Sequence, residues 1–295
     1  MGSEESLEQV ARDINTLSSF LGMRDVPTLC RNTFVARYGF EQADVMALFG
    51  GSILAGGDVL ADAMRAGVAR TYVIVGGAGH TTETFRARAR ELCPEVKFAD
   101  DATEAQIFSA YLSHAHGLEA DFLETRSTNC GNNITYLRDL LAEKGISCKS
   151  LILSQDATMQ RRMVAEVEKE MPSVLPIAFA TYAVSVVVRD GELAFDHSPH
   201  GMWTIRRYLT LLMGEIPRLT DDENGYGPCG QGFLAHVDIP NEVRAACERL
   251  LARYPWSMRK ADPPLCGIAR RVQHGGVAWR VQPLLSCRFR LVSAP

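Results

Sequence analysis

Residues 71–82 read TYVIVGGAGHTT, and this stretch decides the fold class. Its first five residues are apolar or β-branched at almost every position, which is typical of a strand buried on both faces. A glycine-rich turn follows and leads into a segment with helical spacing. A buried strand that ends in a glycine turn and a helix is the first half of a βα unit in a parallel sheet.

Comparable units lie on both sides of this stretch. Short apolar runs predict further buried strands at residues 43–49, 150–154 and 174–179. Apolar spacing predicts helices at residues 58–66, 82–92, 104–114, 132–143 and 159–170. Strands that alternate with helices predict an α/β fold, and we expect a Rossmann-like three-layer sandwich with a mostly parallel sheet.

The two ends of the chain differ from this alternating region. An amphipathic helix at residues 6–22 and a C-terminal helical extension, with helices at 203–213 and 241–253, flank it. We therefore expect three segments: an N-terminal helical segment, a Rossmann-like domain with C-terminal helices, and a basic tail. Their boundaries are residues 1–35, 36–255 and 256–295.

The last segment has its own composition. It holds seven Arg or Lys residues and one Asp, a net charge of +6, without clear periodicity. A loosely attached tail is the simpler interpretation. A basic arm for an acidic partner or a membrane surface is the alternative.

Composition narrows the function classes. The 295 residues carry a net charge of −4, with 46% hydrophobic and 22% charged residues, as in ordinary soluble globular proteins. This balance disfavours nucleic-acid binding through bulk charge, and no apolar run is long enough to cross a bilayer. The acidic start lacks the apolar segment of a secretory signal. We expect a cytoplasmic protein whose partner is a small-molecule ligand.

The eight cysteines give no sign of a metal or disulfide framework. No two of them form a CxxC pair, and no histidines cluster with them at zinc-ligand spacing. We expect reduced thiols and no metal site.

Glycines after the first two strands are candidate ligand-binding residues, because parallel sheets bind ligands at the carboxyl ends of their strands. They are Gly50 and Gly51 after the first strand, and Gly77 and Gly79 after the second. Glycine lets the backbone approach a ligand closely. The alternative is a tight turn that needs a positive φ. The pattern Gly77-x-Gly79 matches only part of a dinucleotide fingerprint, because the third glycine is missing.

His80 and Glu104 are the candidate catalytic residues. His80 lies within the glycine-rich turn, where a side chain has little packing to do and is placed to act as an acid or base. Glu104 begins a helix, so it is a candidate base or an acceptor for a ribose hydroxyl. A purely structural role is the alternative for both, since a glutamate at a helix N-terminus is favourable in any case.

Two further polar segments complete the predicted site. Residues 124–133, ETRSTNCGNN, hold more hydrogen-bonding side chains than helix capping needs, so we expect Asn129 and Asn133 to face the cleft. Arg161 follows the strand at 150–154 and is a candidate for binding a carboxylate or phosphate. A solvated helix surface is the alternative for this arginine.

Several uncommon strings in the chain together resemble the YdcF family, a domain of unknown function shared with the SanA and ElyC envelope proteins. They are GGAGH at 76–80, STNCGxN at 127–133, QDxTMQRR at 155–162, RYLxLLxGExPRL at 207–219, DDxxGYGP at 221–228 and HVD at 236–238, where x is a position outside the resemblance. The resemblance covers about residues 40–245 and is closest to the member that gives the family its name. It implies a Rossmann-like fold, a cytoplasmic location and S-adenosylmethionine binding without an established reaction.

One position departs from the family pattern. Asn132 stands where members of the family usually have Glu. If that Glu acts as a base in them, this chain lacks it.

We therefore expect a small-molecule binding protein whose ligand contains adenosine, with S-adenosylmethionine as the first candidate. Whether it is an enzyme stays open, and a transferase is the class that this ligand favours, since an activated methyl donor needs mainly positioning. One alternative is an enzyme that acts on a phosphorylated or nucleotide substrate. Another is a non-catalytic ligand sensor that contacts a partner through residues 221–233 or the basic tail. The glycines of residues 221–228 also permit a lid.

Overall fold

The computed structural model describes residues 6–79 and 81–258, all within a unit that spans Met1–Ala261. His80 and residues 259–295 of the predicted basic tail lie outside the described residues.

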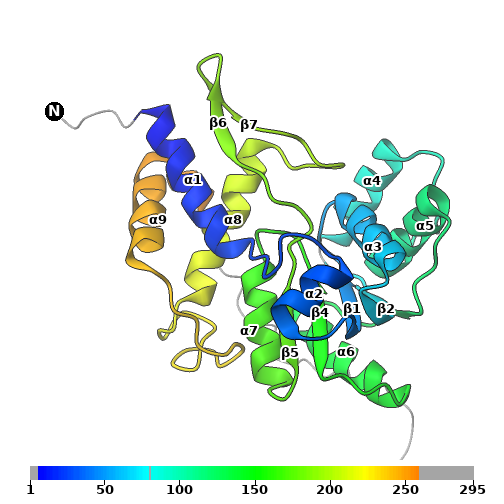
Figure 1. The fold of residues 1–295 in the computed structure, drawn as a ribbon. Helices are drawn as coiled ribbons and strands as arrows, with labels where there is room; N and C mark the ends of the chain where they lie inside the picture. Colours follow the sequence, from blue (N-terminus) through cyan, green and yellow to red (C-terminus); the bar gives the residue numbers. More distant parts are fainter. Residues whose placement is uncertain (1–5, 80, 259–295) are drawn as a thin grey trace, which may run out of the picture. The chain divides into compact units, whose positions relative to one another are not determined.

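A five-stranded parallel sheet forms the centre of the described structure (Figure 1). Its strands are β1 (Ala43–Phe49), β2 (Ala69–Val75), β3 (Phe122–Glu124), β4 (Ser150–Ser154) and β5 (Leu175–Ala178). They lie in the order β3-β2-β1-β4-β5, and every neighbouring pair is parallel. The chain therefore builds outward from β1 to one side and then crosses to the other side at β4. This reversal between β1 and β4 is the topological switch point of a doubly wound sheet.

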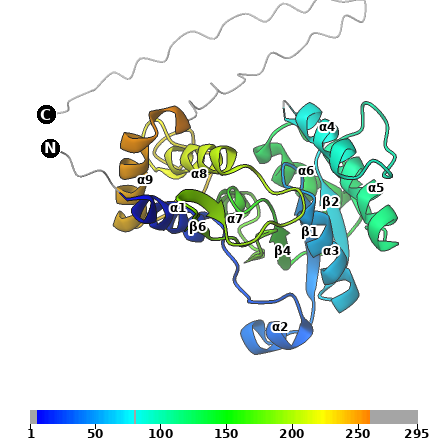
Figure 2. The ribbon, with the colours of Figure 1, turned by 90° about the horizontal axis from the view of Figure 1, so that it is seen from above.

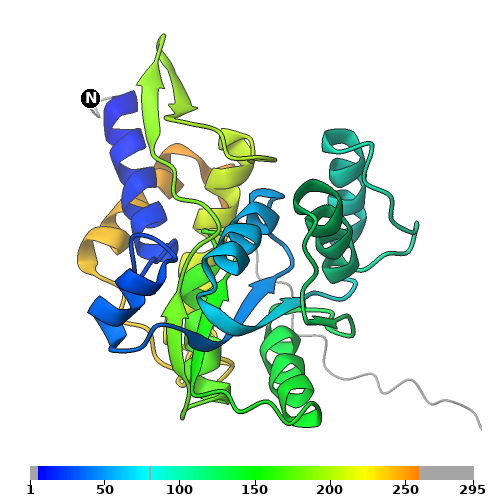
Figure 3. The same ribbon diagram turned by 45° about the vertical axis from the view of Figure 1, so that its right-hand side comes forward.

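Helices cover both faces of the sheet, as can be followed in Figure 3. Met46 and Leu48 of β1 join one core, which also contains side chains of α3 (Ala55–Ala66), α4 (Thr82–Leu92) and α5 (Glu104–His116). Val45, Ala47 and Phe49 join the other, with α6 (Cys130–Glu143) and α7 (Gln160–Glu170). Alternate residues of one strand thus face two apolar layers. The predicted three-layer sandwich is confirmed.

A further core lies beside the sandwich. It contains α1 (Leu7–Leu21), α8 (Ile205–Leu219), α9 (Asn241–Arg253) and a hairpin of β6 (Val186–Arg189) and β7 (Glu192–Phe195). Figure 2 shows α1, α8 and α9 side by side, and all three contact one another. The predicted N-terminal helix and C-terminal helical extension are confirmed. The boundaries at residues 35 and 255 stay predictions.

Helix α2 (Arg31–Tyr38) and the two strands of the β6–β7 hairpin were missed from the sequence. Helix α2 buries only Phe34, so its apolar residues give no clear helical stripe. The sequence of the β6–β7 hairpin does carry a turn signal, because an Asp-Gly pair favours tight hairpin turns. In the structure Asp190 and Gly191 have the positive φ values that such a turn needs, 53° and 78°.

One predicted boundary was wrong. We expected a helix that ends at residue 213, whereas α8 continues through Pro217 to Leu219. Burial of Ile216 and Leu219 on the same stripe offsets the hydrogen bond that a proline removes.

None of the helices in the described part of the chain is long and apolar enough to cross a membrane.

Candidate functional site

Four polar turns meet at the carboxyl ends of the strands, which we call the carboxyl edge. They comprise residues 50–52, 76–79, 125–129 and 155–158, and they follow β1, β2, β3 and β4. In the sheet, Phe49 pairs with Val75 and Val75 pairs with Glu124, so the turns that follow these residues are neighbours. The structure thus brings the sequence segments of the predicted site together at one edge.

Glu104 joins the glycine turns that follow β1 and β2. Its side chain is almost fully enclosed, with the residue 8% exposed. The Thr82 hydroxyl donates to Glu104 Oε1 at 3.0 Å and itself accepts from the Gly79 amide at 2.8 Å. The Gly51 amide also donates to the carboxylate. The carboxylate therefore holds both turns in place.

Burial raises the pKa of the Glu104 carboxyl above its ordinary value. Hydrogen bonds from Thr82, Gly51 and Thr81, and the charge of Arg86, act in the opposite direction. A carboxyl with a raised pKa at the ligand-binding edge of an α/β sheet is suited to acid–base chemistry.

The glycines of these turns fit against other parts of the protein. A Cβ on Gly50 would overlap the Glu104 carboxylate, and one on Gly77 would overlap the carbonyl oxygen of Ser127. Gly51 has open space around it but a φ of +80°, which favours glycine for conformational reasons. A Cβ on Gly79 would lie 3.0 Å from the Thr128 oxygen. These contacts explain the glycines without a ligand, and their role in binding one stays a prediction.

The asparagines that follow β3 differ in the hydrogen bonds that their side chains make. Asn129 is the N-cap of α6, where its Oδ1 accepts from the Asn132 amide at 3.0 Å. Asn129 Nδ2 donates to Asn132 Oδ1 at 2.6 Å. Asn132 thus occupies the third helical position, where a glutamate commonly completes a capping box. A glutamate at this position would have a structural explanation that needs no base.

Asn133 is the asparagine whose amide stays available. The residue is 8% exposed, and its side chain makes no hydrogen bond with any residue that the structure describes. Within the described residues, the fully enclosed side-chain nitrogen and oxygen atoms without a partner are Arg88 Nε and Glu166 Oε2, so the Asn133 amide keeps access to solvent.

Arg161 is engaged elsewhere. Its Nε donates to the Phe20 carbonyl oxygen at 2.5 Å, and its guanidinium carbon lies 4.0 Å from the centre of the Phe20 ring. These contacts join α7 to α1. Burial also lowers the pKa of the guanidinium. Its predicted role in binding a carboxylate or phosphate stays a prediction.

Asp156, directly after β4, was missed as a central residue of this edge. It is 1% exposed, and its Oδ1 accepts from the Thr158 and Tyr182 hydroxyls, each at 2.7 Å. Its Oδ2 accepts from the Trp203 indole at 2.8 Å. Burial raises the pKa of this carboxyl, and the three donors oppose that effect. Its place at the end of a buried strand was the signal that could have identified it.

A buried ionic cluster lies between α6, α7 and α8. Arg162 Nε donates to Glu215 Oε2 at 2.6 Å, and Arg162 Nη1 lies 3.4 Å from Glu166 Oε1. Glu166 Oε2 is buried without a hydrogen-bond partner within the described residues, and burial raises the pKa of this carboxyl to about 7. The Cys130 thiol lies beside Arg162, and burial raises its pKa.

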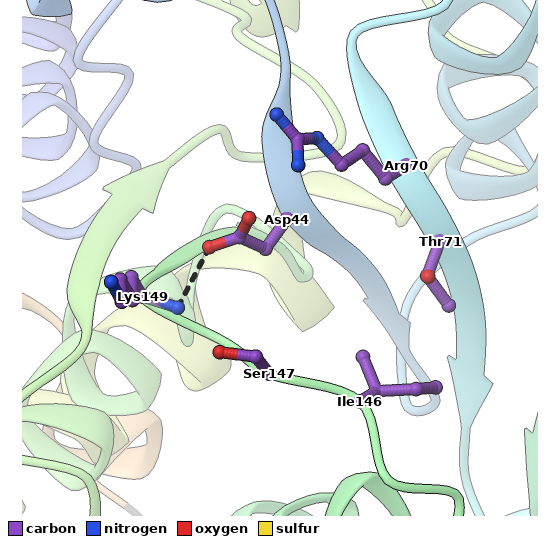
Figure 4. A pocket seen from close by; sticks show the side chains of 6 residues that line it. All are labelled: Asp44, Arg70, Thr71, Ile146, Ser147 and Lys149. Carbon is purple, nitrogen blue, oxygen red and sulfur yellow. Dashed lines mark hydrogen bonds between the residues drawn. The ribbon is translucent and has the colours of Figure 1, made fainter.

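A pocket of about 310 Å³ lies at the opposite, amino ends of the strands (Figure 4). Its lining residues are Asp44, Arg70, Thr71, Ile146, Ser147 and Lys149. The Asp44 carboxylate already accepts from the Lys149 and Ser150 amides at 2.8 and 3.1 Å, which ties β1 to β4. A second pocket, of about 500 Å³, lies beside α5. Neither pocket contains a predicted site residue.

A comparison with known protein families finds no family model that matches the chain. Within the described residues, no group of three or more His, Cys, Asp or Glu side chains is placed to hold a metal ion.

Proposed function

We propose that the protein is a YdcF-like small-molecule binding protein that takes an adenosine-containing ligand at the carboxyl edge, with S-adenosylmethionine as the first candidate. The observation that carries this proposal is Glu104, a buried carboxyl fixed between the glycine turns of β1 and β2. A carboxylate has about four acceptor sites. The protein's own donors to it are Gly51, Thr81 and Thr82, which leaves room for one ligand hydroxyl. In Rossmann folds an acidic side chain serves the ribose in this way.

Asn133 supports the same ligand class. Its amide offers donors and an acceptor on one planar group, and adenine presents a matching acceptor and donor on its edge. Its amide keeps access to solvent and makes no hydrogen bond with a described residue, so a ligand can pair with it without breaking an existing contact.

The structure offers less to a phosphorylated substrate. Arg161 is bound to Phe20 and Arg162 to Glu215, so neither of the paired arginines is free for a phosphate group. The raised pKa of Glu104 favours an enzyme with acid–base chemistry over a simple sensor, and turnover of the bound ligand would decide between them.

The test is calorimetric titration of the purified protein with S-adenosylmethionine, S-adenosylhomocysteine, ATP and NAD. We expect micromolar binding of the first two. Asn133→Ala should weaken it about tenfold, since a lost hydrogen bond to a buried polar group costs roughly 1–3 kcal/mol. Thr135→Ala is the matched control, because its hydroxyl, on the same helix, donates only to α6 carbonyl oxygens.

Two results would contradict the proposal. If the folded protein binds none of the four compounds, the adenosine assignment is wrong. If S-adenosylmethionine binds with unchanged affinity to both Asn133→Ala and Glu104→Gln, the ligand lies elsewhere on the protein.

A further inference from the structure

Residues 196–204, which we call the strap, connect β7 to α8 by way of the carboxyl edge. The chain runs out toward α3 before it turns back into α8 (Figure 3). The Ala55 amide, at the start of α3, donates to the His200 carbonyl oxygen at 3.0 Å. Arg88 of α4 donates to the Gly201 carbonyl oxygen at 2.8 Å and also to that of Met202. The strap therefore lies on the first turn of α3 and on α4.

The strap also reaches the other side of the switch point. The Trp203 indole donates to Asp156, directly after β4, whereas Ala55 follows the glycine turn of β1. Its contacts thus reach the segments that follow both β1 and β4, the neighbouring strands of the switch point. Doubly wound sheets bind their ligands in this crevice.

A directed chain of hydrogen bonds fixes His200. The Tyr111 hydroxyl lies 2.7 Å from Asp58 Oδ1 and 3.0 Å from His200 Nδ1. Because a carboxylate only accepts, the single hydroxyl proton of Tyr111 goes to Asp58, and His200 Nδ1–H must donate to the Tyr111 oxygen. His200 Nε2 is then the acceptor that faces Cys93 Sγ at 3.8 Å. Tyr111 is therefore a positioning residue for the strap.

Apolar packing holds the end of the strap, where Met202 is buried in the core that contains α8 and Trp203 packs against that core, but not residues 196–201. Met202 is the one residue of the strap that is buried, while Asp196, His197 and Ser198 are exposed. Residues 196–201 have polar contacts and no buried side chain, and such segments open at a lower free-energy cost than core segments do. Such segments commonly serve as lids.

We propose that the strap is the lid of the ligand site: it leaves Asp156 and Tyr111 to admit the ligand and returns over it. This proposal rests on the proposed function. It assigns closure to a segment other than residues 221–228, which the sequence permits as a lid. That loop belongs to a region held to the middle and far end of α7, where the Ala235 amide donates to the Ala165 oxygen at 3.0 Å and Lys169 donates to Gly232 (Figure 1). Since α7 begins at the carboxyl edge and runs away from it, these contacts lie off the site.

Hydrogen exchange of the full chain, followed by mass spectrometry of peptides over residues 196–204, tests the lid. Tyr111→Phe removes only the hydroxyl and should raise the exchange rate of these peptides several-fold. Trp203→Phe, which removes the bond to Asp156, should do the same independently. The control is His197→Asn, because His197 contacts only the neighbouring Asp196. Saturating S-adenosylmethionine should slow exchange in the wild-type strap about tenfold.

The outcomes separate the lid from the function. One outcome is that S-adenosylmethionine binds in calorimetry, but neither the ligand nor the two variants change hydrogen exchange in the strap. This result would overturn the lid and leave the proposed function intact. An equal rise in strap exchange in His197→Asn and Tyr111→Phe would also overturn it, because the hydrogen bond to Tyr111 would then have no specific role in closure. Absence of binding for all four compounds overturns the function and the lid with it.

Discussion

The two edges of the sheet are built from the same strands but carry different chemistry. At the carboxyl edge, buried Glu104 and Asp156 bind donors from several turns, so their carboxylates organise a connected network. At the amino edge, Asp44 ties two strands together beside exposed Arg70 and Lys149.

The direction of the helices explains this difference. Helices α4, α6 and α7 begin at the carboxyl edge, so unpaired N–H groups and the positive ends of helix dipoles gather there. Helix α3 ends at the amino edge, where the Gln42 side chain donates to the Gly67 carbonyl oxygen at 2.7 Å. Backbone N–H groups at helix starts thus gather at one edge, and carbonyl groups at a helix end lie at the other.

The largest expected effect compares one glycine from each edge. Gly77→Ala places a Cβ against the Ser127 backbone, so we expect a loss of about 3 kcal/mol in the free energy of unfolding. Gly145→Ala, in the turn after α6, meets open space and has only the cost of a φ of +66°, roughly 1 kcal/mol. Urea denaturation measures both. Equal losses would show that the carboxyl edge is no more tightly built than the amino edge.

A smaller effect depends on pH and involves Glu166, in the ionic cluster beside the carboxyl edge. Its pKa rises from 4.5 to about 7 in the folded protein, so the folded state holds the proton more tightly than the unfolded state. The stability contribution is therefore complete below pH 4.5 and is lost as the pH rises through about 7. We expect it to be on the order of 1–3 kcal/mol.

Glu166→Gln should remove this part of the pH dependence and stabilise the protein at pH 8. Glu41→Gln, an exposed glutamate just before β1, is the matched control and should leave the profile unchanged. Thermal unfolding between pH 5 and pH 8 measures both profiles. A wild-type stability that rises across this range, with no change in Glu166→Gln, would refute the assignment.

The smallest expected effect is at the amino-edge pocket. Arg70→Gln and Lys149→Gln change exposed side chains, so we expect shifts below about 0.5 kcal/mol in the free energy of unfolding. Neither should alter the affinity for S-adenosylmethionine in calorimetry. A large loss of affinity in either variant would show that the ligand binds at the amino edge and not at the carboxyl edge.

Much of the fold could be predicted because parallel strands buried on both faces appear as short apolar runs. Residues 43–49 and 150–154 were predicted as strands with the bounds that β1 and β4 have. Helix α2 lacked a clear apolar stripe, and α8 continued past the predicted end because its later turns are buried. Local spacing therefore determined most elements but not those whose limits depend on packing.

The residues of the candidate site also divide into those that the sequence placed and those whose role depended on packing. The sequence by itself placed Asn129 and Asn133 after a strand, at the edge where a parallel sheet binds ligands, and Glu104 at the start of a helix. Only the tertiary structure decided that Asn129 caps a helix and that Arg161 is bound to Phe20, 141 positions away in the chain. The partnership of Tyr111 with His200 spans 89 positions. Such pairs depend on how whole elements pack, and the spacing of residues along one helix or strand carries no information about them.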